Sequence, residues 1–427
     1  MGAPVKKSKN TPPTWSRGGL VAALDIGTTK VCCFIARRTA GQALRVVGIG
    51  HQASRGLRGG TLVDLDAAEA TIRATVEAAE RMAGENIREV VVNISAGSPT
   101  SRLIAYEVSV SGHQIGDADI RRILDPSAVH AEVPEDHEVI HTIPVGYTVD
   151  GCRGVRDPRG MFGQRLGVNL HTITAASGAL RNLNTCVARC HLDPAAKVVS
   201  SYASALGCLV DDETALGVTL IDMGGGTTSI AVYFDGELVH THTIPIGGAH
   251  VTNDIARGLS TPVAQAERMK TLFGSCLPSP SDDRQFIEVP PIADDGAGDF
   301  GQVPRSMLVS IVRPRLEETF EMARTHLEDA GFSKVAGRRL VLTGGASQLA
   351  GAPELAGMIL DKQVRLGRPR PLEGLPDAAT APAFATCAGL LQYTLNQPID
   401  SVHQTSAAVE EPTTKLGRIG QWLRENF

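Results

Sequence analysis

Ile221-Asp222-Met223-Gly224-Gly225-Gly226-Thr227-Thr228 is the stretch that decides how this chain folds. An apolar run beginning at residue 217 leads into it and a second run, 229–234, leaves it, which predicts a strand, a tight turn and a returning strand. Near the N-terminus, Leu24-Asp25-Ile26-Gly27-Thr28-Thr29 repeats this arrangement, and its returning strand covers 31–36. Internal duplication predicts two related lobes, which agrees with a length of 427 residues.

Both turns have the composition of an anion site. Glycine and threonine in a tight turn let backbone N–H groups and hydroxyls face an anion without obstruction by side chains. The aspartate that ends each first strand, Asp25 or Asp222, can hold a magnesium ion through water beside that anion. One such turn is also typical of an ordinary hairpin. Two matched copies and a third Gly-Gly turn, at residues 344–345, favour a phosphate site instead.

The pattern changes between the two hairpins. A helix over 67–82 and a strand over 89–94 complete a βββαβ order for the first lobe. From residue 97 to residue 175 strands alternate around one short helical pattern at 118–124, which predicts an inserted α+β unit. The region that follows the second hairpin contains a stretch, 278–304, rich in Pro, Gly, Ser and Asp, and we predict a loop there.

The chain therefore divides into segments with different expected roles. We expect a flexible basic arm (1–18), a first lobe (19–96 and 176–210) interrupted by the inserted α+β subdomain (97–175), a second-lobe core (211–250 and 337–395) that carries a small subdomain (251–336), a flexible tether (396–412) and an amphipathic helix (413–427).

Composition excludes several classes of protein. The charged fraction of 20%, the apolar fraction of 42% and the net charge of −5 are those of an ordinary globular chain, so we expect no nucleic-acid partner. No apolar run reaches the roughly 20 residues that span a bilayer, and the N-terminal arm lacks a signal-peptide core, which predicts a cytoplasmic chain. The cysteine pattern fits a reduced compartment. Cys186, Cys190 and His191 have no second pair at zinc-finger spacing, so we assign no metal ligand there.

The last fifteen residues form a separate pattern. Apolar side chains recur every three or four positions, which places them on one face of a helix with Lys415, Arg418 and Arg424 beside it. This pattern suits the surface of an anionic membrane, although a helix docked on its own globular domain is the alternative. The expected membrane-binding residues are Leu416, Ile419, Trp422, Leu423 and Phe427.

The paired hairpins resemble the two phosphate loops of the actin, sugar-kinase and heat-shock-chaperone ATPase superfamily. The resemblance implies an α/β fold of two duplicated lobes around a nucleotide cleft, with ATP and Mg²⁺ as cofactors. It also makes the turn after Thr343 an adenosine loop, and places Glu267 and Lys270 beside the ribose and adenine, although this pair is also typical of a solvated helix surface. The residues expected to bind the cofactor are Asp25, Gly27, Thr28, Thr29, Lys30, Asp222, Gly224, Gly225, Gly226, Thr227, Thr228, Glu267, Lys270, Gly344, Gly345, Ala346 and Ser347.

The position that would support hydrolysis departs from the pattern of the superfamily. Relatives in this superfamily begin the helix that crosses between the lobes with an acidic or amide residue that orients the attacking water. Here that position is occupied by Ser200 and Ser201, and a hydroxyl is a poor base near neutral pH. We therefore name no catalytic residue and expect a slow ATPase at most.

Together, the two phosphate hairpins, the insert and the tethered terminal helix resemble the FtsA family of actin-like cell-division proteins over residues 19–427. The resemblance implies a polymer at the cytoplasmic face of the bacterial inner membrane, at the division site. It also implies anchoring of FtsZ filaments through the FtsZ C-terminal tail, and recruitment of later divisome membrane proteins. Candidates for the FtsZ contact are Arg305, Arg313 and Arg315, for which solvated arginines are the alternative. A related actin-fold assembly ATPase of pilus or secretion machinery is the second interpretation of the whole chain.

Overall fold

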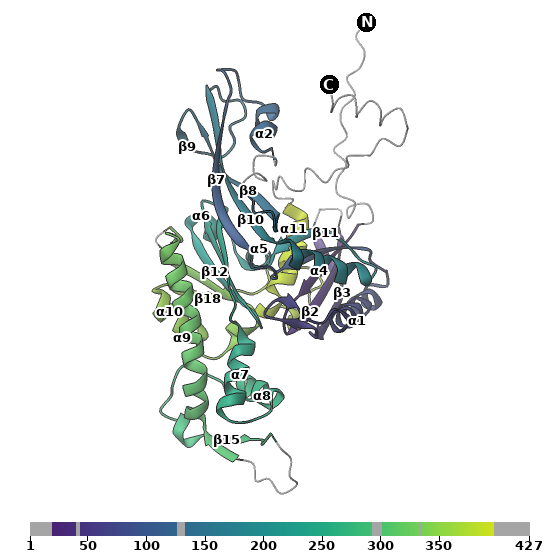
Figure 1. Cartoon of the computed structure of the whole chain (residues 1–427), viewed down its shortest axis with the longest axis vertical. Coiled ribbons are helices and arrows are strands. Elements are labelled where there is room, and N and C mark those ends of the chain that lie inside the picture. Colours follow the sequence, from purple (N-terminus) through teal and green to yellow (C-terminus); the bar gives the residue numbers. More distant parts are fainter. Residues whose placement is uncertain (1–18, 40–42, 126–132, 293–300, 334, 397–427) are drawn as a thin grey trace.

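The computed structural model describes residues 19–39, 43–125, 133–292, 301–333 and 335–396. Two lobes, each built on a sheet, lie side by side (Figure 1). A strand-rich subdomain extends from one end of the molecule and a helical subdomain extends from the other. The basic arm, the amphipathic helix over 413–427 and the tether from residue 397 onward lie outside the described residues.

The first lobe contains a five-stranded sheet in the order β11-β6-β1-β2-β3. Its central hairpin pairs antiparallel, whereas β6 and β11 run parallel to β1. The longest helix of this lobe begins where the Asp64 carboxylate caps the Ala67 N–H at 3.1 Å, and ends at Gly84, whose φ of 74° only glycine adopts readily. The elements are β1 (Leu20–Ile26), β2 (Lys30–Arg38), β3 (Leu44–Ala53), β4 (Leu57–Arg58), β5 (Thr61–Leu62), α1 (Leu65–Ala83), β6 (Glu89–Ile94), α4 (Ser177–Arg189) and β11 (Asp193–Val199).

The second lobe repeats this sheet strand for strand in the order β14-β13-β12-β17-β18. β12 and β13 form the antiparallel hairpin, and β17 and β18 run parallel to β12, as β6 and β11 do to β1. The predicted internal duplication is therefore confirmed. The elements of this core are α6 (Asp211–Leu216), β12 (Val218–Met223), β13 (Thr228–Phe234), β14 (Glu237–Ile244), β17 (Arg339–Thr343), α10 (Ala352–Leu360) and β18 (Gln363–Leu366).

The inserted subdomain is an antiparallel sheet in the order β7-β10-β8-β9, with a short helix and an apolar cluster of its own. Its two longest strands, β8 and β10, reach from the tip of the subdomain down to the lobes (Figure 1). The elements are β7 (Thr100–Ser109), α2 (Asp117–Ile123), β8 (His137–Val149), β9 (Cys152–Val155) and β10 (Arg165–Ala176). The sequence pattern missed β9, because exposed polar residues give no period-two signal.

The small subdomain of the second lobe packs α7 and α8 against a long helix, α9. The loop predicted over 278–304 is wrong in part, since β15 and β16 pair there as an antiparallel hairpin. Two apolar side chains, Ile287 and Val289, are buried and hold β15 against the subdomain, a tertiary effect that composition does not show. The elements are α7 (Gly248–Gly258), α8 (Val263–Phe273), β15 (Phe286–Val289), β16 (Gly301–Pro304) and α9 (Arg305–Asp329).

Two helices, α5 (Ser200–Cys208) and α11 (Ala385–Asn396), cross between the lobes. α5 continues directly from first-lobe strand β11 and packs against second-lobe strands β12 and β13, whereas α11 follows the second lobe and packs on β1, β2 and β6. A Cβ atom on Gly207 would lie 2.2 Å from the Ala385 carbonyl oxygen, and one on Gly389 would lie 1.6 Å from that of Ala203. Only glycine permits so close a crossing.

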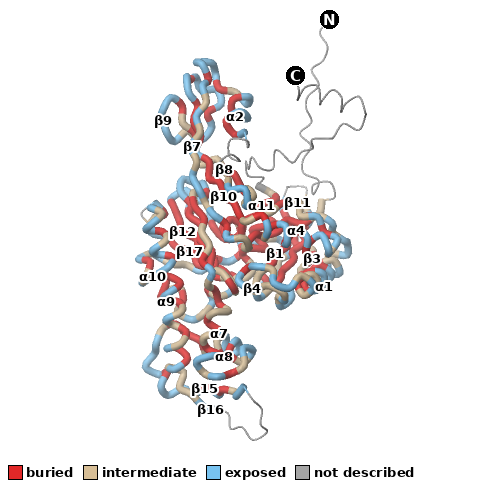
Figure 2. The backbone as a smooth tube through the Cα atoms, in the orientation of Figure 1, coloured by how far each residue is buried: buried red, intermediate tan, exposed pale blue. Residues whose placement is uncertain are grey.

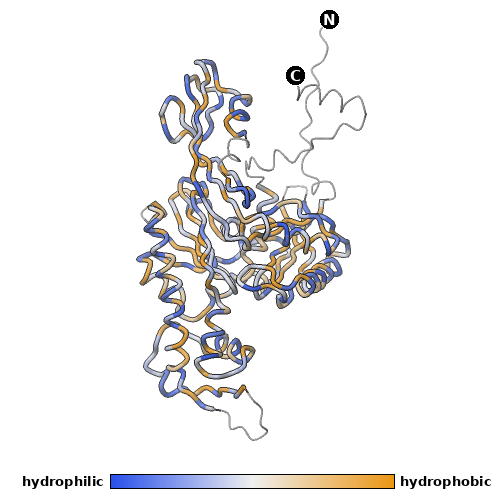
Figure 3. The backbone as a smooth tube through the Cα atoms, viewed as in Figure 1, coloured by the Kyte–Doolittle hydropathy of each residue, from blue (hydrophilic) through white to orange (hydrophobic). Residues whose placement is uncertain are grey.

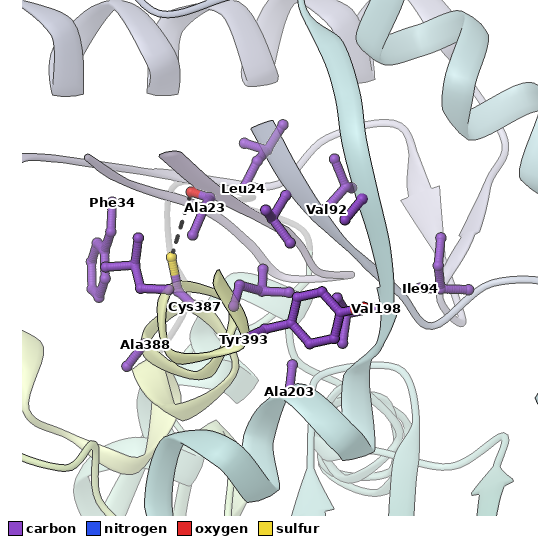
Figure 4. Packing of buried hydrophobic residues seen from close by; sticks show 14 of the residues in the cluster. Ala23, Leu24, Phe34, Val92, Ile94, Val198, Ala203, Cys387, Ala388 and Tyr393 are labelled. Carbon is purple, nitrogen blue, oxygen red and sulfur yellow. Dashed lines mark hydrogen bonds between the residues drawn. The ribbon is translucent and has the colours of Figure 1, made fainter. Parts of the chain in front are cut away.

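The apolar core continues through this crossing. Figure 4 shows Cys387, Ala388 and Tyr393 of α11 packed beneath the first-lobe strands. Buried segments run along both sheets (Figure 2), and hydrophobic segments lie along the same strands (Figure 3). Among the described residues, no helix combines the length and the apolar character needed to cross a bilayer.

Candidate functional site

A cavity of about 610 Å³ lies between the lobes, at the ends of both central hairpins. A volume of this order suits a ligand of nucleotide size. Its lining includes most of the residues expected to bind the cofactor, namely Asp25, Gly27, Thr28, Thr29, Lys30, Asp222, Gly224, Gly225, Gly226, Thr227, Glu267, Lys270, Gly344, Gly345 and Ala346.

The two hairpin turns are closed in the same way. The Gly27 N–H donates to the Lys30 carbonyl at 3.0 Å, and the Gly224 N–H donates to the Thr227 carbonyl at 2.9 Å. In each case a Cβ on the glycine would approach that carbonyl oxygen, to 2.9 Å and 3.0 Å respectively. The duplication seen in sequence therefore extends to the atoms of the turns.

The turns also face each other across the cavity. A Cβ added to Gly225 would lie 2.4 Å from the Thr29 side chain, and one added to Gly226 would lie 2.4 Å from the Thr28 hydroxyl. Glycine is required here because the two lobes approach each other through these residues. The bare backbone forms a cradle that any side chain would fill.

Two buried carboxylates, Asp25 and Asp222, line the same cavity. Burial raises the pKa of Asp25 to about 6; the positive charge of Lys30 opposes that rise, and the negative charge of Asp222 adds to it. Burial also raises the pKa of Asp222, against hydrogen bonds from Ser204 and Thr386 and the charge of Lys30. Two buried carboxylates beside a phosphate-sized cradle are a donor set that suits a hydrated divalent cation.

Lys30 links the first hairpin to the segment before α11. Its ammonium donates to the Ala383 carbonyl and lies 3.9 Å from the centre of the Phe384 ring. The side chain is thus held by a hydrogen bond and a cation–π contact while it lines the cavity.

The second lobe supplies the other wall of the cavity. Lys270 Nζ donates to the Gly248 carbonyl at 3.1 Å, the Thr252 hydroxyl at 2.9 Å and the Glu267 carboxylate at 2.7 Å. These bonds fix the ammonium against the first turn of α7. Gly344, with φ of 85°, begins the third turn, and Gly345 and Ala346 continue it along the cavity wall.

Two of the predicted cofactor residues do not line the cavity. The Thr228 hydroxyl donates to the Ile246 carbonyl at 2.8 Å, and the Ser347 hydroxyl donates to the Gly344 carbonyl at 2.7 Å. Both side chains are fully buried, so they hold the loops in place from behind. Neither residue lines the cavity, and the role of Thr228 and Ser347 in cofactor binding stays a prediction.

The three arginines predicted to contact a partner all lie on α9 and pair within the chain. Arg305 pairs with Asp282, donates to the Phe273 carbonyl at 2.9 Å and lines the cavity. Arg313 pairs with Glu317 at 2.6 Å, and Arg315 pairs with Asp254 at 2.6 Å. Each of the three arginines thus has a carboxylate partner within the chain, and their contact with FtsZ stays a prediction.

Sequence reasoning missed polar residues that come from outside the turns. Asn93, at the end of β6, accepts a hydrogen bond from the Ile26 N–H at 2.7 Å and donates to the Ser200 hydroxyl at 3.1 Å. Thr386, on α11, also lines the cavity. The one available signal was the position of Asn93 near the carboxyl end of a parallel strand, where ligands of α/β sheets bind.

The chain is similar to known proteins along almost its whole length. Residues 219–389 match the family model described as cell division protein FtsA, and residues 97–174 match the SHS2 domain inserted in FtsA. Cell division protein FtsA of Agrobacterium fabrum is 44% identical over 97% of this chain and 97% of its own length. The FtsA proteins of Pseudomonas aeruginosa and Escherichia coli K12 are 37% and 31% identical, each over 96% of this chain and over 99% and 98% of their own lengths.

Solved structures share the fold at low sequence identity. The PilM–PilN type IV pilus biogenesis complex matches with a TM-score of 0.63 at 16% identity, over 88% of this chain and 98% of that one. MreB5 of Spiroplasma citri bound to ADP matches with a TM-score of 0.52 at 14% identity, over 88% and 96%. The predicted actin-type fold is thereby confirmed. With two duplicated lobes, an inserted SHS2 subdomain and relatives that align from end to end, this chain belongs to the FtsA family of actin-like cell-division proteins.

Proposed function

We propose that the cavity binds ATP with Mg²⁺, and that the bound nucleotide favours assembly of the chain into a filament that anchors FtsZ filaments at the cytoplasmic membrane. The observation that carries the proposal is the pair of glycine turns, closed alike and facing each other over one cavity. The MreB5 structures with ADP and with AMPPNP support a nucleotide in a cavity of this fold.

Different residues of the cavity bind different parts of the Mg-nucleotide. Backbone N–H groups of the glycine turns bind the phosphates, and Asp25 and Asp222 hold the hydrated cation, which neutralises phosphate charge. Glu267 and Lys270 lie on the second-lobe side, where Lys270 is fixed by three hydrogen bonds and Glu267 keeps an exposed edge for a ribose hydroxyl. Gly344 and Gly345, which have no side chain, and Ala346, which has only a methyl group, leave room for the base.

Hydrolysis is slow in this proposal. Asn93 donates its amide N–H to the Ser200 hydroxyl oxygen, which leaves the single Ser200 proton free to donate into the cavity. A neutral serine hydroxyl can orient a phosphate oxygen or a water, but it is too weak a base to take a proton from that water. We expect a steady-state turnover far below the median enzyme value of about 10 per second, and a rate near that median would refute this assignment.

Membrane attachment belongs to the last fifteen residues, outside the described part of the chain. Five partly buried apolar side chains contribute at most several kcal/mol after the helix is ordered, so one tail binds weakly and reversibly. A filament that presents many tails makes later contacts intramolecular. Attachment therefore strengthens when ATP or FtsZ promotes assembly. The relatives named cell division protein FtsA support a place at the division site, where later divisome proteins join.

Co-sedimentation with anionic liposomes tests the proposal. The intact chain is compared with the Trp422→Glu variant, with and without Mg-ATP and with a peptide copy of the FtsZ C-terminal tail. We expect Mg-ATP to raise pelleting of the intact chain, and we expect the variant to stay soluble while it still binds nucleotide and peptide. Equal pelleting of the two proteins would contradict the anchor, and absence of Mg-ATP binding by calorimetry would contradict the nucleotide site.

A further inference from the structure

One carboxylate of the cavity is held by two side chains that the proposed function does not use. Ser204 Oγ donates to Asp222 Oδ2 at 2.5 Å. Thr386 Oγ1 lies 2.9 Å from Ser204 Oγ and 3.3 Å from the same carboxylate oxygen, so its single proton is shared between them. All three side chains are buried. The other oxygen, Oδ1, lies where a Cβ on Gly344 would be 2.3 Å away, so the carboxylate is enclosed on three sides.

The matching carboxylate of the first hairpin has no such support. Among the described residues, no hydrogen-bond donor holds the Asp25 carboxylate, and what acts on it is burial and the charges of Lys30 and Asp222. The two hairpins are otherwise closed by the same backbone hydrogen bond. The duplication thus provides an internal comparison. In the described part of the chain, hydroxyl groups donate to the second-lobe aspartate and not to the first-lobe one.

The hydroxyls come from the two crossing helices. Ser204 is on α5 and Thr386 is on α11, and each lies three residues before the glycine at which its helix touches the other, Gly207 or Gly389. Residues three apart share a helix face, so the hydroxyl pair and the glycine contact lie on the same seam. Any change in the crossing of the helices therefore moves the two hydroxyls relative to Asp222.

We propose that Ser204 and Thr386 are positioning residues, a hydroxyl clamp that fixes the orientation of Asp222 and couples cation-dependent nucleotide binding to the crossing of α5 and α11. α5 packs on the second-lobe sheet and α11 on the first-lobe sheet, so their crossing sets how the lobes meet. Because coupling is reciprocal, loosening the clamp weakens the contribution of the cation to nucleotide affinity. The inference rests on the proposed Mg-nucleotide site. It adds that binding at this site affects both lobes through the two crossing helices.

The decisive variant is Thr386→Val, which keeps the shape of the side chain and removes its hydroxyl. Its matched control is Thr394→Val on the same helix, where a buried hydroxyl donates to the Leu391 carbonyl of its own turn. Nucleotide affinity is measured by calorimetry in excess Mg²⁺ and in EDTA. The affinity gained from Mg²⁺ is the ratio of the two values. We expect this gain to be about tenfold smaller in Thr386→Val than in the intact chain, because one hydrogen bond to a charged group is removed. Thr386→Ser restores the gain, and Thr394→Val behaves as the intact chain does.

A second readout follows the helices themselves. In the intact chain, Mg-nucleotide slows amide hydrogen exchange of both α5 and α11, and in Thr386→Val this protection falls while thermal melting shows a folded protein. Folded Thr386→Val could gain as much nucleotide affinity from Mg²⁺ as the intact chain, with the same slowing of amide exchange. That result would overturn the clamp and leave the nucleotide site standing. Absence of Mg-dependent binding by the intact chain would instead overturn the proposed function, and the clamp with it. Ser204→Ala serves as a second variant and should reproduce the Thr386→Val result.

Discussion

The hairpin of the first lobe and the hairpin of the second lobe have the same turn but different surroundings. The first is supported by a cation, since Lys30 reaches from β2 to the Ala383 carbonyl. The second is supported by neutral hydroxyls from two helices, at Asp222. The duplicated motif therefore forms the same backbone turn in both lobes. The residues that surround each carboxylate and act on its charge come from other parts of the chain, and they differ between the two copies.

The largest effect should come from the place where the hairpins touch. Gly225→Val puts a branched side chain where even a Cβ would lie 2.4 Å from Thr29 of the other hairpin, so it fills the cradle. We expect ATP affinity to fall more than about 100-fold by calorimetry, because an overpacked site costs about 1–3 kcal/mol or more and the phosphate contacts are lost as well. Gly178→Ala on α4, where an added Cβ meets nothing within 4 Å, is the control. Tight ATP binding by folded Gly225→Val would place the phosphates elsewhere.

The second prediction distinguishes Asp25 from Asp222 by the pH dependence of stability. The folded-state pKa of Asp25, about 6, lies above its ordinary value of 3.8, so the folded chain binds the extra proton between these values. The stability from this proton is fully present below pH 3.8 and is lost as the pH rises through 6. Above pH 6, Asp25→Asn should therefore have a larger unfolding free energy than the intact chain, by up to about 3 kcal/mol, and a higher melting temperature. Near pH 4 the two proteins should melt alike.

The measurement is thermal melting of the nucleotide-free protein in EDTA from pH 4 to pH 8. Asp222→Asn is the matched comparison. Its gain in stability should be smaller, because the hydroxyls of Ser204 and Thr386 already stabilise the ionised carboxylate that the substitution removes. Parallel pH profiles for the intact chain and Asp25→Asn would show that Asp25 stays ionised throughout.

The sequence predicted most of the fold because its strongest signal was local and occurred twice. Each turn lies between two apolar strands, so the hairpins and their two related lobes followed from the pattern, whereas the shared cleft followed from the superfamily resemblance. The clamp could not be predicted in this way. Ser204 and Thr386 are 182 positions apart and meet only where the helices cross, and a serine or threonine in an Ala-rich helix carries no distinguishing pattern.

The places where the structure departs from the local pattern have the same physical origin. Thr228 and Ser347 belong to the motifs, yet tertiary packing turned their hydroxyls toward backbone carbonyls behind the cavity. The hairpin of β15 and β16 formed in a stretch rich in turn residues because Ile287 and Val289 are buried against the subdomain. In each case, packing against residues distant in sequence determined a local conformation that the motif alone does not determine.

A smaller effect should come from the cation that supports the first hairpin alone. Lys30→Met keeps the length of the side chain and removes the hydrogen bond to Ala383 and the cation–π contact with Phe384. We expect the unfolding free energy of the nucleotide-free chain to fall by about 1–2 kcal/mol. Lys30→Arg, which retains the charge, should lose less. Because the Lys30 charge also lowers the pKa of Asp25, Lys30→Met should move the pH dependence of melting upward, and an unmoved profile would show that this charge does not act on Asp25.

The smallest effect should distinguish two threonines at nearby positions of the two turns. The Thr28 hydroxyl accepts the Gly60 N–H at 2.9 Å at the edge of the cavity, whereas the Thr228 hydroxyl donates to the Ile246 carbonyl at 2.8 Å behind it. Each substitution by valine removes one hydrogen bond of about 1 kcal/mol. Thr28→Val should lower ATP affinity by about fivefold, and Thr228→Val should lower the melting temperature and leave affinity unchanged. Calorimetry and thermal melting on both variants decide the matter, and a loss of affinity in Thr228→Val equal to that in Thr28→Val would show that both threonines act on the ligand.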